Sequence, residues 1–590
     1  MHSPISALAE RTLRIAVFLV AAVYLITGVA YLCLDYWPYT ETDFWQIYQV
    51  CFYYPWWQSA LFKIHNHSLF FPSFFWLADL HFFHGSQLVL FVAGLCLQTI
   101  CTVLLLLPLW RDSTLEPTAR SLGIMTIVVA SFWMGRAAIT TSGGFNCITS
   151  LALLGAVSAF LLLPRMQLTS RSRWQTSSLV IGCGFVATFS FGSGAAVWPT
   201  LLFLGWSLRV SWRSLVSLFL AGLVATLIYK FLPPPEDQSE LWHSLDSTPI
   251  LALASFKHLC RFIGAPAFYS IEAWQGVKMT GALIESSRLL LFIGAVGLCL
   301  AVLLLATSCF RRNLRGQQLE FLGLALIGFN LCVALLAVIS RVERFQDLPV
   351  DAAAPRYFYW SSLFWAGLLL VVINHANCHR WLRGSCIALV VAFPVLGWQF
   401  HRDEGLHWRY ARLLAMECGT SLINNVADPE RLLAPSQDQV DNLLPTLRAR
   451  RLDMFAARLQ DLLGQPVSRL FNGREDPIPF RGRAAAELLH GGRDQATVVK
   501  ISGQLIPQGT PLPTSMVIVD SQEKVAGIAS SFESNTIINK ILFGGRMPNG
   551  RLVGYIRDYQ ASTPYVLRAI SQNGVSTKQI PIAPLPRGVK

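Results

Sequence analysis

The chain has 590 residues, of which 53% are hydrophobic and only 14% are charged, and its mean hydropathy of +0.46 excludes an ordinary soluble domain. The formal net charge of +13 would suit nucleic-acid binding, but the basic residues sit in short clusters between apolar stretches, where they act as orientation signals for membrane insertion. The 13 cysteines form no CxxC pair and no Cys/His cluster, which excludes a disulfide framework and a cysteine-based zinc site.

Apolar runs recur along the first 400 residues. The first is about 20 residues long and has no small-residue cleavage site, so it is predicted to be a retained membrane helix and not a signal peptide. The sequence predicts about eleven crossings, at residues 13–34, 86–109, 119–135, 145–163, 177–191, 195–208, 214–232, 287–309, 320–340, 358–374 and 385–400.

Residues 177–208 are too many for one crossing and too few for two ordinary ones, since a span needs about 17 residues or more. A break at Gly192-Ser193-Gly194 places all the basic clusters on one side of the membrane, whereas an unbroken crossing divides them. The stretch is therefore predicted to be two short spans or a re-entrant pair, with the N-terminus cytoplasmic and the C-terminus outside. This topology leaves three long loops on the outer face, at residues 35–85, 233–286 and 341–357.

The fold class predicted is an α-helical polytopic membrane protein with an extracytoplasmic α+β tail. Residues 1–400 form the membrane domain, and residues 401–495 are polar with helical periodicity, which predicts a helical connector. Residues 496–590 contain short β-like runs such as Met516 to Val519, which predict a small antiparallel β-sandwich.

Acids, imidazoles and aromatic rings crowd together in the first outer loop. A carboxylate there suits a general base or a metal ligand, while histidine and tryptophan suit a polar substrate whose lipid tail lies in the bilayer. The alternative is an interfacial belt of tryptophan and tyrosine at the headgroup level, which explains the acids less well. The candidate site residues of this loop are Asp43, Trp45, His65, Asn66, His67 and Asp79.

Arginines mark the outer end of several runs. Arg136 ends one run, while Arg341 and Arg356 flank the short third loop, and guanidinium groups suit phosphate. As alternatives, these arginines pair with nearby acids or extend to lipid headgroups. Residues 256–269 are amphipathic and are predicted to lie along the membrane surface.

Three stretches resemble a known family. They are His65-Asn66-His67-Ser68 leading to Asp79, Ser190 to Gly194 leading to Trp198-Pro199, and Ala354-Pro355-Arg356-Tyr357 leading to Ser361-Ser362. Together with the topology, they are similar to the glycosyltransferase C superfamily, the membrane glycosyltransferases that use polyprenyl-phosphate sugars, and especially to bacterial arabinosyltransferases and pilin-modifying enzymes. That group more usually has Glu at the place of Asn66 and Arg at the place of Ser68.

The resemblance implies an inverting displacement at the outer face of a bacterial inner membrane, with the tail in the periplasm. Asp43 would deprotonate or orient the acceptor, which is a glycan or a protein, and Arg356, Arg341 and His67 would bind the donor phosphate. The substrate would contact His65, Asn66, Trp45, Tyr357 and Asp79, although Asp79 has a structural brace as its alternative role. A divalent metal is possible in this superfamily, and the sequence does not require one.

Two other classes of function stay open. A lipid-linked sugar flippase would need a polar path across the bilayer, and no acid lies in the middle of an apolar run. A non-catalytic envelope assembly protein would depend on its tail and not on its loops.

Overall fold

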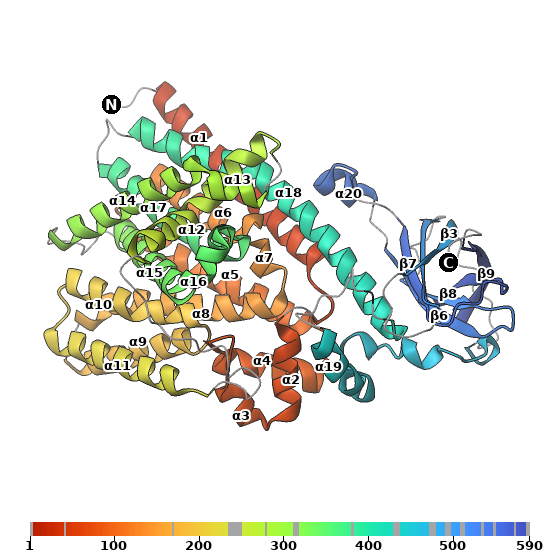
Figure 1. The fold of residues 1–590 in the computed structure, drawn as a ribbon. Helices are drawn as coiled ribbons and strands as arrows, with labels where there is room; N and C mark the ends of the chain where they lie inside the picture. Colours follow the sequence, from red (N-terminus) through yellow and green to blue (C-terminus); the bar gives the residue numbers. More distant parts are fainter. Residues whose placement is uncertain are drawn as a thin grey trace. The chain divides into compact units, whose positions relative to one another are not determined.

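The computed structural model describes residues 4–40, 43–167, 170–233, 251–277, 280–310, 318–378, 383–426, 428, 437–470, 480–489, 497–507, 514–532, 536–546, 550–571 and 574–585 (Figure 1). By their internal contacts, the residues fall into two units. Unit 1 comprises Met1–Leu34, Tyr54–Trp76 and Leu90–Gly405, and unit 2 comprises Asp35–Tyr53, Leu77–Val89 and Leu406–Lys590. The tail is thus grouped with two pieces of the first loop.

Unit 1 is helical because its apolar runs satisfy their backbone polar groups only within helices. Its elements include α1 (Pro4–Asp35), α3 (Trp56–Leu61), α5 (Leu88–Arg111), α6 (Pro117–Phe132), α7 (Ala137–Thr140), α8 (Gly143–Leu162), α9 (Ser170–Thr188), α10 (Val197–Ser207), α11 (Trp212–Phe231), α12 (Leu251–Trp274), α13 (Gly281–Ser286), α14 (Arg288–Phe310), α15 (Gln318–Ser340), α16 (Val342–Asp347), α17 (Phe358–Cys378) and the start of α18 (Arg383–Ile423). Helix α4 (Phe70–Phe82) contributes residues to both units.

Within the described ranges, nine helices are long and apolar enough to cross a membrane, which indicates a multi-pass membrane protein. They match nine of the eleven predicted runs. The two runs outside this set are 177–191 and 195–208, which correspond to α9 and α10. The count of eleven therefore stays a prediction.

The chain bends between α9 and α10, as the sequence predicts. Helix α9 ends at Thr188, and a 3-10 turn at Gly192–Ala196 leads into α10. Gly194 is required there because a Cβ would lie 1.8 Å from the carbonyl oxygen of Ala187. Helices α9, α10 and α11 lie side by side in the yellow part of the ribbon (Figure 1).

Helix α12 packs along α14 and against α17, and its residues Phe262 and Ile263 are fully buried. Its polar residues His258 and Arg261 are 3% and 8% exposed, so these two side chains contact protein, whereas Lys257 is exposed. The position of this helix along the membrane surface stays a prediction.

Unit 2 combines helices α2 (Phe44–Tyr53), α19 (Gln437–Arg450) and α20 (Thr536–Phe543) with a β-barrel. The barrel strands are β3 (Phe480–Leu488), β4 (Val499–Pro507), β5 (Ser515–Val519), β6 (Val525–Phe532), β7 (Arg551–Ile556), β8 (Val566–Ser571) and β9 (Gly574–Ala583), drawn in blue in Figure 1. Their order is β3-β4-β7-β6-β5-β8-β9, and β9 returns to β3.

The predicted sandwich is therefore wrong in one respect, because the strands close into a barrel. All neighbouring strands pair antiparallel except β3 and β9, which pair in parallel through Ala484↔Ile582 and Ala485↔Ala583. The sheet also starts at Phe480, inside the range predicted as connector. Alternate strand residues such as Ile501, Ile518 and Leu567 fill the interior.

The last part of α18 is fixed to the barrel within unit 2. The side chain of Asn424 accepts a hydrogen bond from the N–H of Ile528 (2.7 Å) and donates one to its carbonyl (2.9 Å), which imitates a strand neighbour. Glu417, 5% exposed in its side chain, forms ion pairs with Lys500 (3.4 Å) and Arg551.

Candidate functional site

A small hairpin carries three of the predicted site residues. Strands β1 (Lys63–Ile64) and β2 (His67–Ser68) pair antiparallel, and the two residues between them, His65 and Asn66, have φ values of 49° and 64°. Such a two-residue turn requires positive φ at both positions, which asparagine adopts readily. The backbone therefore accounts for asparagine at position 66.

The hairpin is held against the turn between α9 and α10. The hydroxyl of Tyr229 donates to the carbonyl of Asn66 (2.7 Å) and accepts from the N–H of Ser68 (3.3 Å). The imidazole of His67 lies on the ring of Phe191, with 4.2 Å between centroids. A Cβ at Gly192 would lie 2.7 Å from His67 Nδ1, so only glycine allows this approach.

The pKa of His67 is lowered to about 3, first by burial and then by the charges of Arg341 and His65. His67 is therefore neutral near pH 7. It offers a phosphate a hydrogen bond but no positive charge, which changes its predicted role.

Arg341 and Arg356 meet at one aromatic ring, and we call Arg341, Arg356, Tyr357 and Asp351 the arginine–tyrosine cluster. Arg341 Nη1 donates to the hydroxyl of Tyr357 (2.5 Å), and the guanidinium carbons of Arg341 and Arg356 lie 5.8 and 5.3 Å from its ring centre. Arg356 forms an ion pair with Asp351 (3.2 Å), as Arg344 also does (2.7 Å). Among the described residues, Arg341 has no carboxylate partner, so the cluster carries excess positive charge.

Aromatic residues of α12 and α16 pack against this cluster. The ring of Phe262 lies 4.9 Å from that of Tyr357, and Phe345 contacts both Tyr357 and His258. Arg261 donates to the carbonyl of Glu285 (3.2 Å) and lies 3.4 Å from His258 Nδ1. The buried aromatic rings fix Tyr357, and Tyr357 fixes the arginines.

Asp43 and Trp45 belong to unit 2. Asp43 is half-buried at the start of α2, and its carbonyl accepts hydrogen bonds from the N–H groups of Gln46 and Ile47 (3.2 Å each). Trp45 is only 1% exposed. Trp45 is thus a core residue in this structure, and its predicted contact with substrate finds no support in its placement.

Asp79 lies in a buried polar group in unit 2. It is 0% exposed, and its Oδ2 accepts from the hydroxyl of Tyr48 (3.3 Å) and the N–H of Gln87 (3.4 Å). A second buried acid, Asp453, accepts from the N–H of Thr40 (2.9 Å) through its Oδ2. This placement favours the role of structural brace for Asp79.

Burial raises the pKa of Asp79 to about 6 and that of Asp453 to about 7, and the charge of Asp79 raises the second pKa further. We call Asp79, Asp453 and Tyr48 the buried acid group. Nothing in the local sequence marks Asp453, because its partners are hundreds of residues away along the chain.

The predicted site residues thus fall into two groups, each inside one unit. Unit 1 brings together His65, Asn66, His67, Arg341, Arg356 and Tyr357, whereas unit 2 holds Asp43, Trp45 and Asp79. Within the described ranges, no three His, Cys, Asp or Glu side chains gather as ligands for a metal ion. No protein-family model, curated protein or solved structure matches this chain.

Proposed function

We propose that the chain is a membrane glycosyltransferase that moves a sugar from a polyprenyl-phosphate donor to an extracytoplasmic glycan or protein. The observation that carries this proposal is the grouping, inside unit 1, of three segments that are distant in sequence. These are the hairpin at residues 63–68, the turn at Gly192 and the loop at 341–357. They are the segments that carry the resemblance to the glycosyltransferase C superfamily. The first segment packs on the second, and the charge of Arg341 in the third acts on His67 in the first.

The charge of the arginine–tyrosine cluster supports a phosphate as ligand. Two guanidinium groups share one carboxylate at Asp351, and Arg341 has none among the described residues, so an anion would complete the charge balance. A guanidinium binds phosphate oxygens in pairs, and it stabilises the negative charge that grows on a leaving phosphate. Arg341 and Arg356 are the proposed donor-phosphate residues, with neutral His67 as a hydrogen-bond donor.

Asp43 is the proposed general base. Its carboxylate would take the proton of the acceptor hydroxyl while that oxygen bonds to the sugar carbon, and the bond from this carbon to the phosphate oxygen would break. The lipid phosphate leaves with the electron pair. The choice of Asp43 rests on the chemistry of its carboxylate and on the acid that the resembling family carries in its first loop. Asp43 lies in unit 2, whereas the proposed phosphate-binding residues lie in unit 1.

Donor binding is tested with a polyprenyl phosphate that carries no sugar, measured by native mass spectrometry on the purified chain. Arg341→Gln is expected to weaken binding at least tenfold, because a guanidinium–phosphate bond is lost. Arg213→Gln, at an exposed arginine of α11, is the matched control and should bind as the unchanged chain does. Equal affinity for all three proteins would refute the phosphate site.

Catalysis is tested by the release of polyprenyl phosphate from a labelled polyprenyl-phosphate sugar. Asp43→Asn keeps a residue suited to the start of α2 but removes the base, and it is expected to slow turnover about 100-fold or more. Asp347→Asn, at an exposed acid of α16, is the control. Full activity of Asp43→Asn would remove Asp43 from the mechanism.

The same measurements separate the other two classes of function. Binding of the lipid without sugar transfer, together with lipid movement across vesicle membranes, would make the chain a transporter. No binding, with loss of function only when residues 480–590 are deleted, would make it an assembly protein. The proposed location of the barrel outside a bacterial inner membrane predicts that external protease cleaves it in intact spheroplasts.

A further inference from the structure

A groove lined by three helices of unit 1 combines an apolar wall with a cluster of arginines. Its volume is about 540 Å³, which lies within the roughly 300–1,000 Å³ of small-molecule sites. Helices α1, α5 and α6 supply its lining, which comprises Arg11, Arg14, Ile15, Phe18, Trp110, Pro117, Arg120, Ser121 and Ile124. We call it the arginine groove.

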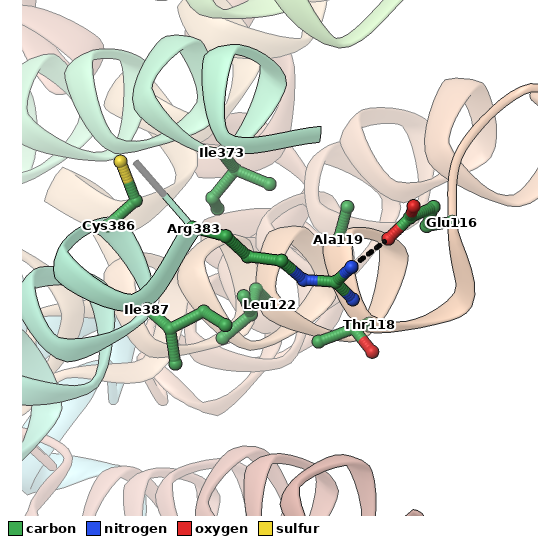
Figure 2. Close-up of a pocket in the computed structure, with 8 residues that line it drawn as sticks. All are labelled: Glu116, Thr118, Ala119, Leu122, Ile373, Arg383, Cys386 and Ile387. Carbon is green, nitrogen blue, oxygen red and sulfur yellow. Dashed lines mark ion pairs between the residues drawn. The ribbon is translucent and has the colours of Figure 1, made fainter. Parts of the chain in front are cut away.

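The acids beside this groove are already engaged. Arg383 forms ion pairs with Glu10 (3.4 Å) and Glu116 (2.9 Å), and the second pair is drawn in Figure 2. The carboxylate of Asp112 accepts two hydrogen bonds from Thr114, at 2.9 and 2.6 Å. Arg383 therefore pairs with both glutamates and offsets one of their two negative charges.

Two of the three groove arginines donate to backbone carbonyls within the described residues. Arg120 Nη2 donates to the carbonyl of Asp112 (2.7 Å), and Arg14 Nε donates to the carbonyl of Glu10 (3.4 Å). No described carboxylate forms an ion pair with Arg11, Arg14 or Arg120. Their three positive charges exceed the two negative charges that remain nearby, one from the glutamates once Arg383 is counted and one from Asp112, so the groove keeps a net positive charge.

The apolar wall identifies the kind of anion. Ile15, Phe18 and Trp110 are 54%, 45% and 73% exposed, and all three belong to helices that qualify as membrane spans. A soluble anion would leave this wall in water, whereas a lipid covers it with acyl chain. The arginines lie where α1 and α6 begin and α5 ends, which is the level of the headgroups for helices that cross a bilayer.

We propose that the arginine groove binds an anionic glycerophospholipid, with the phosphate at Arg11, Arg14 and Arg120 and an acyl chain along Ile15, Phe18 and Trp110. Basic pockets between membrane helices bind such headgroups for this reason. The inference uses no part of the proposed glycosyl transfer. It holds or fails whether or not the chain is an enzyme.

The test is native mass spectrometry of the full chain with phosphatidylglycerol and, separately, phosphatidylcholine. The triple variant R11Q/R14Q/R120Q is expected to bind phosphatidylglycerol about 100-fold more weakly. Each lost arginine charge is expected to weaken binding by about fivefold. The charge-matched control is R111Q/R165Q/R213Q, at three exposed arginines of unit 1 outside the groove, and it should bind as the unchanged chain does.

Three results would overturn the proposal. They are equal loss in both triple variants, which would show only general charge attraction, equal binding of phosphatidylcholine, and full competition by glycerol phosphate, which lacks the acyl chain. A second measurement, on the unchanged chain, tests the proposal if the triple variant folds poorly. Phosphatidylglycerol added to the unchanged chain should raise its thermal unfolding midpoint, and an unchanged midpoint would count against the site.

Discussion

Replacing Asp453 by Asn tests the energetic consequence of burying two acids in unit 2. Asp453 is 6% exposed, and the Oδ1 atoms of Asp453 and Asp79 have no hydrogen-bond partner among the described residues. Asp453 has a φ of 55°, which asparagine also adopts readily, and the amide oxygen still accepts from the N–H of Thr40. The substitution thus removes a charge and keeps the backbone and the hydrogen bond.

The sign of the pH dependence follows from the raised pKa values. The folded state holds the proton of Asp453 up to a pKa of about 7, whereas the unfolded chain releases it near 3.8, so the folded state binds it more tightly. This contribution to stability is fully present below pH 3.8 and is lost as pH rises through 7. Between pH 5 and 8, linkage gives a loss of about 3 kcal/mol from Asp453 and about 1 kcal/mol from Asp79.

The assay is the thermal unfolding midpoint of the purified chain at pH 5, 6.5 and 8, with hydrogen exchange of residues 36–53 and 440–455 as a local readout. The unchanged chain should lose stability as pH rises. Asp453→Asn should remove most of this pH-dependent loss, and it should be the more stable protein at pH 8. Asp461→Asn, at an exposed acid, is the control. A variant with an unchanged pH slope, or one that is less stable at pH 8, would refute the reasoning.

Three further substitutions have expected outcomes. Gly192→Ala places a Cβ 2.7 Å from His67 Nδ1 and should destabilise unit 1 by about 1–3 kcal/mol, measured by thermal unfolding. Arg136→Lys should also destabilise by about 1–3 kcal/mol, because Arg136 is 1% exposed, lies 3.8 Å over the ring of Tyr359 and bonds two carbonyls. Glu417→Gln should speed hydrogen exchange in β7, and less so in β4, because Arg551 loses its acid at the end of α18 while Lys500 keeps its ion pair with Asp428 (3.6 Å).

Matched controls make these three results specific. Gly182→Ala adds the same methyl group to α9, where nothing lies within 4 Å, and it should change stability by no more than about 1 kcal/mol. Arg213→Lys changes an exposed arginine and should be neutral. Glu487→Gln changes an exposed acid on β3, and exchange in β7 should stay as it is. A control that behaves like its partner would remove the structural explanation.

The sequence was sufficient to predict a structural feature where the residues that determine it lie close together in the chain. Hydropathy over about 20 residues locates a membrane helix, and three small residues at 192–194 locate the bend between α9 and α10. The short apolar run from Met516 to Val519 located β5 in the same way.

The sequence was insufficient to predict features that depend on contacts between residues far apart in the chain. Closure of the barrel depends on β3 pairing with β9, nearly 100 residues later, and no local pattern distinguishes this from a sandwich. The lowered pKa of His67 comes first from burial by distant segments and then from the charge of Arg341, and the buried carboxylate of Asp79 is bonded by Tyr48 and Gln87. The burial of His258 and Arg261 in α12 likewise depends on other segments, such as the carbonyl of Glu285.

Within the described strands of unit 2, β3 and β9 close the barrel through only two residue pairs, Ala484↔Ile582 and Ala485↔Ala583. The other described residues of β3 pair with β4 alone, so this seam leaves backbone groups of the kind to which an extended polypeptide adds as a further strand. The two residue pairs between β3 and β9 are the fewest of any strand contact in the barrel, so this is where a strand could be displaced with the least loss of backbone hydrogen bonds.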